Sequence, residues 1–172
     1  MLAYLFVVVA VAVRFLPHPL AFTPVGAALL YFGARAPRKH IWFPLALLAA
    51  SDIYLTRSAY AYPFTLDHLA TWAWYAAALW IGGFLRQDAR PLRIAGASLA
   101  SSVTFFIASN FAVWAVWNMY PRTLGGLIQC YVAAVPFARN IPADLLFSAV
   151  MFGLGALLAP QPAEDLGRTA AA

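Results

Sequence analysis

Charged residues are scarce in this sequence. Only 10% of its 172 residues are Asp, Glu, Lys or Arg, whereas 64% are apolar and the mean hydropathy is +0.77. Soluble domains carry about a quarter charged residues, so this composition excludes an ordinary soluble or secreted globular domain. It predicts an integral membrane protein with the lipid bilayer as its solvent.

Cysteine and catalytic motifs are also lacking. Cys130 is the only cysteine, which excludes an intrachain disulfide and a metal site built from several thiolates. The sequence has no G-x-S-x-G, H-E-x-x-H or Walker A motif. We therefore predict a protein that is not an enzyme and that holds neither a cofactor nor a metal.

What the sequence does have is a series of apolar runs separated by Pro, Gly or charged residues. Six of these runs are candidate transmembrane helices, at 2–16, 23–36, 41–55, 67–85, 92–117 and 142–158. The second and third are short for a span of about 20 residues, so a re-entrant segment stays open for either. A further apolar stretch, 124–137, contains Gln129 and Pro136 and is predicted as an interfacial or re-entrant helix.

These runs predict an all-α fold, a polytopic membrane bundle of six transmembrane helices plus that one interfacial or re-entrant helix. Residues 1–159 would form a single transmembrane domain. Residues 160–172, which lack helical periodicity, would form a flexible cytoplasmic tail.

The basic residues predict which way the bundle faces. The net charge of +5 does not indicate nucleic acid as a partner, because the basic residues stand in short clusters between apolar runs. With six crossings, one side of the membrane receives Arg35, Arg38, Lys39, Arg86, Arg90, Arg93 and Arg168, and the other receives Arg14, Arg57, Arg122 and Arg139. The positive-inside rule then places both termini in the cytoplasm.

Polar residues gather at the predicted outer end of the bundle, where an unpaired charge near lipid is costly. Helical spacing puts Asp67, Thr71 and Tyr75 on one face, and Asn140 with Asp144 on another. Convergence of such faces would form a pocket for a small polar molecule. Its predicted residues are Arg14, His18, Asp52, Asp67, Tyr75, Asn110, Trp114, Arg139, Asn140 and Asp144.

Simpler explanations stay open for several of these residues. The aromatic residues also fit the belt found at membrane interfaces, and Asp67 also fits a helix cap. We expect an ion pair among Asp52, Arg139 and Asp144, because each follows or enters an apolar run. Such a pair serves helix packing as well as it serves ligand contact.

Several motifs carry a resemblance that covers nearly the whole chain. They are RFLPHPLAFTPVGA at 14–27, followed by Ser51 and Asp52, and then GASLASS at 96–102, NFAVW at 110–114, YPRT at 120–123, CYVAAVPFARN at 130–140, and Asp144. With these motifs the chain resembles a family of small bacterial membrane proteins described only as transport proteins. More distantly, it is similar to the S components of energy-coupling factor (ECF) transporters, six-helix proteins that capture vitamins or metal ions on the outer side.

This resemblance implies uptake of a small molecule such as a vitamin or corrinoid across the bacterial cytoplasmic (inner) membrane, with ECF-type transmembrane and ATPase subunits as partners. Among S components, the chain looks nearest to a solitary cobalamin transporter. In that protein a His, an Asp and an Arg resembling His18, Asp52 and Arg139 accompany a cysteine that binds cobalt. Thr65 stands in the corresponding loop here, and Cys130 lies elsewhere in the chain.

Two other classes of function remain as alternatives. One is a membrane-embedded enzyme that uses Asp67, His68 and Asp144 for acid–base chemistry on a lipid or isoprenoid group. The other is a structural subunit of a membrane complex, whose polar cluster would pair internally and leave no cavity.

Overall fold

The structure is a computed structural model that describes residues 1–17, 22–59, 61 and 63–159. The candidate site residue His18 and the predicted tail at 160–172 lie outside the described residues.

The described residues form an all-α fold with seven α-helices. They are α1 (Leu2–Val13), α2 (Val25–Arg35), α3 (Trp42–Tyr54), α4 (Asp67–Gly83), α5 (Pro91–Val116), α6 (Leu124–Ala134) and α7 (Asn140–Leu157). Short helical turns follow α2, α3 and α6, at η1 (Arg38–His40), η2 (Leu55–Ala59) and η3 (Val135–Phe137). The apolar runs of the sequence therefore located every helix to within a few residues.

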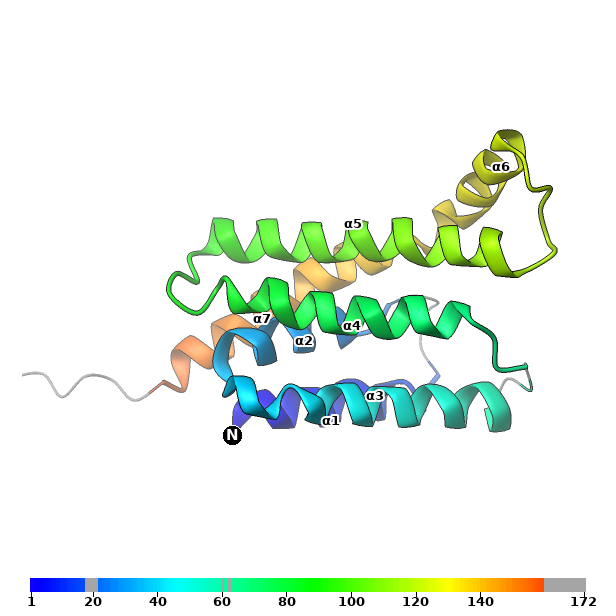
Figure 1. Ribbon diagram of the computed structural model, residues 1–172. Helices are drawn as coiled ribbons and strands as arrows, with labels where there is room; N and C mark the ends of the chain where they lie inside the picture. Colours follow the sequence, from blue (N-terminus) through cyan, green and yellow to red (C-terminus); the bar gives the residue numbers. More distant parts are fainter. Residues whose placement is uncertain (18–21, 60, 62, 160–172) are drawn as a thin grey trace, which may run out of the picture.

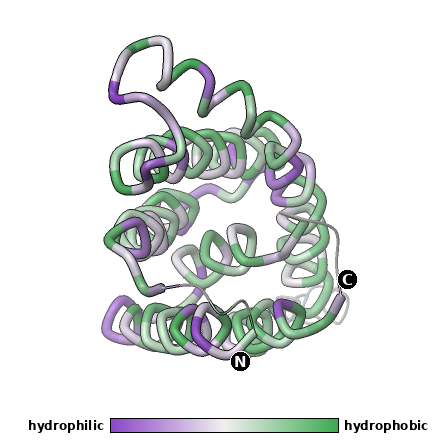
Figure 2. The backbone as a smooth tube through the Cα atoms, turned by 90° about the vertical axis from the view of Figure 1, so that its right-hand side faces the viewer, coloured by the Kyte–Doolittle hydropathy of each residue, from purple (hydrophilic) through white to green (hydrophobic). Residues whose placement is uncertain are grey.

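The helices form a ring around α2. Helix α2 packs against α1, α4, α5 and α7, while α1 meets α3, α3 meets α4, α4 meets α5 and α5 meets α7. Helices α1 to α5 and α7 run roughly along one axis (Figure 1), and the view down that axis shows α2 in the middle (Figure 2). Helix α6 packs on α5 and is folded back at an angle near one end of the bundle (Figure 1).

The central position of α2 explains its burial and its composition. All ten residues from Val25 to Ala34 are buried, and none of them is charged. A helix surrounded on every side needs no polar face. Its 11 residues extend only about 16 Å, which is shorter than the hydrocarbon core of a bilayer.

Two glycines allow α2 and α4 to pack closely. A Cβ atom at Gly33 would overlap the backbone carbonyl oxygen of Leu79, and one at Gly82 would overlap that of Leu30. Small residues at a helix crossing let two backbones approach, as is common in membrane helix pairs. The contact between α2 and α4 therefore depends on the absence of side chains at these two positions.

Two helices, α5 and α7, are long and apolar enough to cross a membrane. Helices α1 and α2 and the stretch Leu124–Phe137 are apolar but shorter. The prediction of an all-α fold is confirmed, and the structure supports two helices of spanning length where six were expected.

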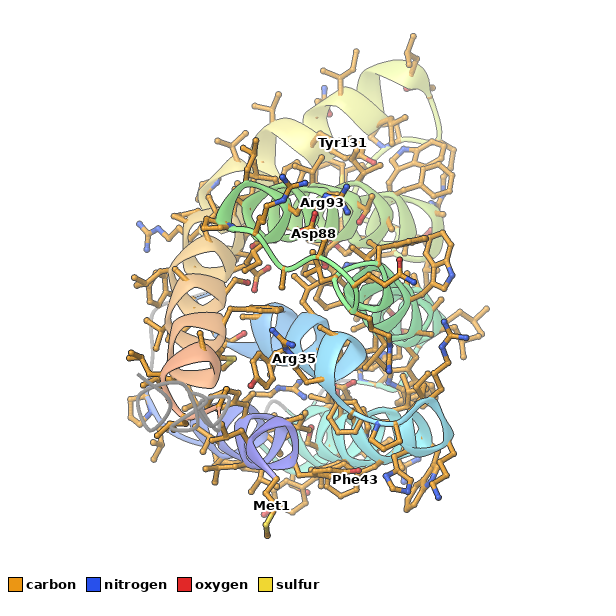
Figure 3. All side chains as sticks on the ribbon, turned by 90° about the vertical axis from the view of Figure 1, so that its left-hand side faces the viewer. Met1, Arg35, Phe43, Asp88, Arg93 and Tyr131 are labelled. Carbon is orange, nitrogen blue, oxygen red and sulfur yellow. The ribbon has the colours of Figure 1, made fainter. Side chains whose placement is uncertain are left out.

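One end of the bundle carries a cluster of basic residues. Figure 3 looks onto this end and shows Met1, Arg35, Asp88 and Arg93. In the connection between α4 and α5, the Asp88 carboxylate accepts from Arg90 Nε at 2.9 and 3.0 Å and lies 3.2 Å from Arg93 Nε. The hydrogen bond from Arg90 lowers the pKa of Asp88, so the Asp88 carboxylate keeps its negative charge within this exposed network.

Candidate functional site

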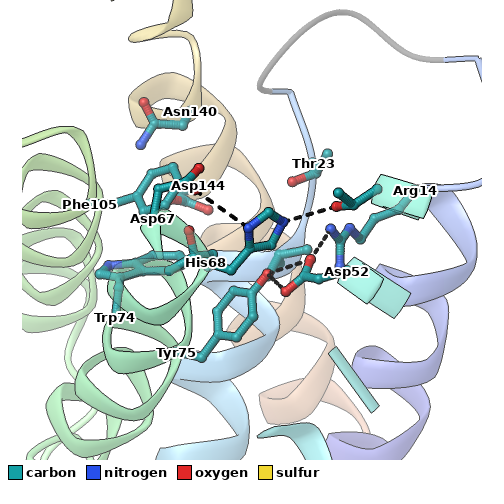
Figure 4. A pocket seen from close by; sticks show the side chains of 14 residues that line it. Arg14, Thr23, Asp52, Asp67, His68, Trp74, Tyr75, Phe105, Asn140 and Asp144 are labelled. Atoms are coloured by element: carbon teal, nitrogen blue, oxygen red, sulfur yellow. Dashed lines mark hydrogen bonds and ion pairs between the residues drawn. The ribbon is translucent and has the colours of Figure 1, made fainter. Parts of the chain in front are cut away.

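A cavity of about 390 Å³ opens at the end of the bundle opposite this basic cluster. It is bounded by the residue that follows helix α1, the end of α3, the first turns of α4 and α7, the middle of α5, and the N-terminus of the central helix α2 (Figure 4). Its lining comprises Arg14, Thr23, Val25, Gly26, Asp52, Thr56, Asp67, His68, Thr71, Trp74, Tyr75, Phe105, Asn140 and Asp144. Segments distant in the sequence thus supply one polar cavity.

Asp52 is the hydrogen-bonding centre of one wall. Its buried carboxylate forms an ion pair with Arg14 and accepts from Trp72 Nε1 at 2.9 Å and from the Tyr75 hydroxyl at 3.1 and 3.2 Å. Arg14 also donates to the Ser51 hydroxyl at 2.6 Å. The ion pair and these donors offset the cost of burying the carboxylate, and they join α1, α3 and α4 at this depth.

Asp144 lies on the opposite wall, beside the N-terminus of α2. Its Oδ2 accepts from the Ser102 hydroxyl at 2.6 Å, and the backbone N–H of Ala27 donates to the same carboxylate. A Cβ atom at Gly26 would overlap this carboxylate. The partial positive charge of a helix N-terminus favours an anion here. The close approach of the Asp144 carboxylate to the backbone of α2 requires that residue 26 be a glycine.

Asn140 stands one turn before Asp144 on α7. It is 8% exposed, and its Nδ2 donates to the Ser102 carbonyl oxygen at 3.2 Å. Its Oδ1 is buried and has no hydrogen-bond partner among the described residues. One buried acceptor beside the cavity therefore has no partner among the described residues.

His68 contacts two threonines, of which Thr56 also lines the cavity. Its Nε2 lies 2.9 Å from the Thr56 hydroxyl and its Nδ1 lies 3.1 Å from the Thr65 carbonyl oxygen. A neutral ring that donates from Nδ1 and accepts at Nε2 satisfies both contacts. Asp67 Oδ1 lies 3.6 Å from His68 Nδ1 and accepts from the Thr65 hydroxyl, so one side of this carboxylate is also occupied.

Most of the predicted site residues do meet in this cavity. Its lining includes Arg14, Asp52, Asp67, Tyr75, Asn140 and Asp144. The face of Asp67, Thr71 and Tyr75 and the pair of Asn140 and Asp144 both point into it, as helical spacing predicted.

Three predicted residues lie elsewhere, and the expected ion pair is wrong. Asn110 donates to the Phe106 carbonyl within α5, and Trp114 donates to the Pro121 carbonyl and lies under the Arg122 guanidinium. Arg139 is exposed at the start of α7, outside the cavity lining. Asp52 pairs with Arg14 instead, because α1 ends beside α3, and the exposed Arg139 forms no ion pair with either carboxylate among the described residues.

The sequence prediction missed several lining residues, above all Thr23, Gly26, Thr56, Trp74 and Phe105. Thr56 lies in η2, the irregular turn that continues α3, and no periodicity rule extends across such a turn. The sequence did carry a signal for Trp74, which neighbours Tyr75 on α4. Its indole donates to the Ser101 carbonyl at 2.9 Å, and its ring packs 4.4 Å from that of Phe105.

Carboxylates dominate the charge of the cavity. Arg14 is balanced by Asp52, and neither Asp67 nor Asp144 forms an ion pair with a described lysine or arginine. No group of three metal-ligating side chains gathers in the part of the chain that the structure describes.

Comparison with known proteins places the chain in a family. Residues 1–166 match the model of a family of unknown function, DUF6580. The chain belongs to this family. No curated protein matches it, and no solved structure does. The match to DUF6580 covers nearly the whole chain, and the function of this family is unknown.

Proposed function

We propose that this member of DUF6580 is a membrane transport protein that binds a small polar molecule in the cavity and takes it up across the bacterial inner membrane. In this proposal α1 to α5 and α7 cross the bilayer, and both termini lie in the cytoplasm. The single observation that carries the proposal is a polar cavity at the end of the bundle away from the basic cluster.

The surface of the bundle supports a membrane location. Large apolar side chains are exposed on its outside, such as Leu5 on α1, Trp80 on α4, Ile107 on α5 and Leu146 on α7. In water such a surface would be a liability, whereas lipid tails solvate it. The basic residues at the C-terminal ends of α2 and α4 and at the N-terminal end of α5 then mark the cytoplasmic side.

The position of the cavity supports a role in uptake. If the basic end faces the cytoplasm, the cavity faces the outside, where a solute would be captured. This arrangement agrees with the resemblance to ECF S components, and it makes ECF-type transmembrane and ATPase subunits the expected partners. A vitamin or corrinoid is the substrate class that this resemblance suggests.

The details of the cavity do not favour cobalamin over other substrates of that class. Asp52 is engaged by Arg14, Trp72 and Tyr75, and Arg139 lies outside the lining. The Asp and Arg that resemble those of a cobalamin transporter thus do not both line this cavity. We therefore keep uptake as the proposal and treat cobalamin as one probe among several.

The test is uptake of labelled vitamins, cobalamin included, by cells or proteoliposomes that contain the full chain. Thr71→Trp places a large side chain in the cavity and should abolish any uptake that the wild type shows. Thr104→Trp is the matched control, because Thr104 is exposed on α5 outside the lining. Equal uptake by Thr71→Trp and the control would reject the cavity as the substrate site.

One contact favours a second candidate, a membrane-embedded enzyme. The Thr56 hydroxyl lies 2.9 Å from His68 Nε2, and Asp67 lies 3.6 Å from the other ring nitrogen. This arrangement resembles a nucleophile, a general base and a carboxylate that orients the base. Such an enzyme would convert a lipid or isoprenoid substrate to product in reconstituted vesicles. The variant His68→Ala would abolish this turnover. Uptake without covalent change, retained in His68→Ala, would exclude it.

A further inference from the structure

The charged, aromatic and imidazole donors that line the cavity are occupied by the protein itself, whereas the hydroxyls of Thr23 and Thr71, which can donate or accept, also line it. Arg14 donates to Asp52 and Ser51, Tyr75 donates to Asp52, and Trp74 donates to the Ser101 carbonyl. Contact with the Thr65 carbonyl occupies the Nδ1–H of His68. Thr56 is engaged at the other nitrogen of that ring. A carboxylate or phosphate ligand would therefore meet an arginine that is already paired with Asp52.

Acceptors, in contrast, remain open. Asn140 Oδ1 is buried without a partner among the described residues, and a buried acceptor left unpaired is costly. Asp144 next to it accepts from Ser102 and Ala27 and faces no described cation across an ion pair. Asp67 adds a second carboxylate to the same lining. The lining is therefore complementary to a ligand that carries hydrogen-bond donors and a positive charge.

Aromatic rings complete this side of the cavity. The rings of Trp74 and Phe105 pack 4.4 Å apart, and both residues line the cavity. In Figure 4 they are drawn on the same side as Asn140 and Asp144, away from Arg14 and Asp52. Aromatic faces attract cations and also bury the apolar body of a ligand.

We propose that the cavity selects a protonated amine: a small molecule with an apolar body and an ammonium group that donates to Asp144, with Asp67 as a second countercharge. This inference rests on the proposed function of the cavity as a substrate site and names the class of substrate. An ammonium group carries three donors and no acceptor, which matches two lining carboxylates that form no ion pair with a described lysine or arginine. A metal ion fits less well, since no group of three metal ligands gathers among the described residues.

The test uses three probes of similar shape and different charge: phenethylamine, phenethyl alcohol and hydrocinnamate. Binding to the purified full chain in detergent is measured by calorimetry and by the thermal unfolding midpoint. We expect phenethylamine to bind and to raise the midpoint, and the alcohol and the carboxylate to bind at least about tenfold more weakly, because a buried charge requires its partner. Binding of the alcohol or the carboxylate as tight as that of the amine, or no binding of the amine, would overturn the inference.

Variants locate the binding. Asp144→Asn should lower the affinity for phenethylamine by about tenfold or more, and Asp88→Asn, at the other end of the bundle, should leave it unchanged. Because Asp144 also holds Ser102 and the start of α2, Asp67→Asn serves as a second variant on a partly exposed carboxylate. Wild-type affinity in both cavity variants would reject the assignment.

Failure here is separable from failure of the transport proposal. Uptake of a neutral or anionic solute that Thr71→Trp blocks would uphold the cavity as a transport site and refute its selectivity for amines. If the wild type took up none of the tested solutes but bound the amine in a way that depends on Asp144, the selectivity would be upheld and the transport proposal refuted.

Discussion

At the scale of single residues, the ion pair between Arg14 and Asp52 determines how the cavity wall is held. Arg14→Met leaves the Asp52 carboxylate buried with only Trp72 and Tyr75 as donors. Removing one partner of a buried pair costs about 3 kcal/mol, so we expect this variant to lose that much of its free energy of unfolding in detergent, measured by SDS titration. Arg90→Met is the control, since its pair with Asp88 is exposed and should contribute little.

The double variant Arg14→Met/Asp52→Asn separates charge from packing. Without the carboxylate there is no buried charge to leave unpaired, so the double variant should be more stable than Arg14→Met alone. Additive losses would contradict the view that an uncompensated charge causes the effect.

The site was predictable from sequence where a helix carries it. Asp67 with Tyr75, and Asn140 with Asp144, follow from helical spacing because side chains four residues apart share a face. Spacing could not predict that Arg14 rather than Arg139 pairs with Asp52, because that choice depends on how α1 and α3 pack in three dimensions. Gly26 was missed because its importance lies in the approach of Asp144 from another helix.

At the scale of helices, α2 and α4 offer a test with a matched control on adjacent residues. Gly82→Ala puts a methyl group where the Leu30 carbonyl oxygen lies, whereas a Cβ atom at Gly83 meets nothing within 4 Å. Overpacking of this kind costs about 1–3 kcal/mol, so Gly82→Ala should unfold at a lower SDS fraction than the wild type. Gly83→Ala should match or exceed the wild type, because alanine is the better helix former.

If Gly82→Ala and Gly83→Ala unfolded alike, the close contact between α2 and α4 would be refuted. The sequence could not have distinguished these neighbouring glycines, since both lie in the last turn of one apolar helix. It did locate the helices themselves, because Pro, Gly and charged residues separate the apolar runs. The central position of α2 follows from packing, and the short length of its apolar run was the only hint of it.

At the scale of the whole molecule, α2 and α6 show why equal length does not mean equal relation to a membrane. Each has 11 residues, too few for a span of about 20. Helix α2 is surrounded by other helices, so protein can satisfy the backbone groups at its ends even at membrane depth. Helix α6 packs chiefly on α5 and exposes Leu124, Ile128 and Val132, so its ends at the same depth would face lipid.

The expected topology follows from this difference. We predict that α6 does not cross the bilayer, and that fusions of periplasmic alkaline phosphatase after Tyr120 and after Ala138, on either side of α6, are both active. A fusion after Asp88, in the basic end of the bundle, should be inactive, with green fluorescent protein at the same site fluorescent. Opposite signals at Tyr120 and Ala138 would make α6 a span and move the C-terminus outside. An active phosphatase after Asp88 would turn the whole bundle over and place the cavity on the cytoplasmic side, where capture of an external solute is physically excluded.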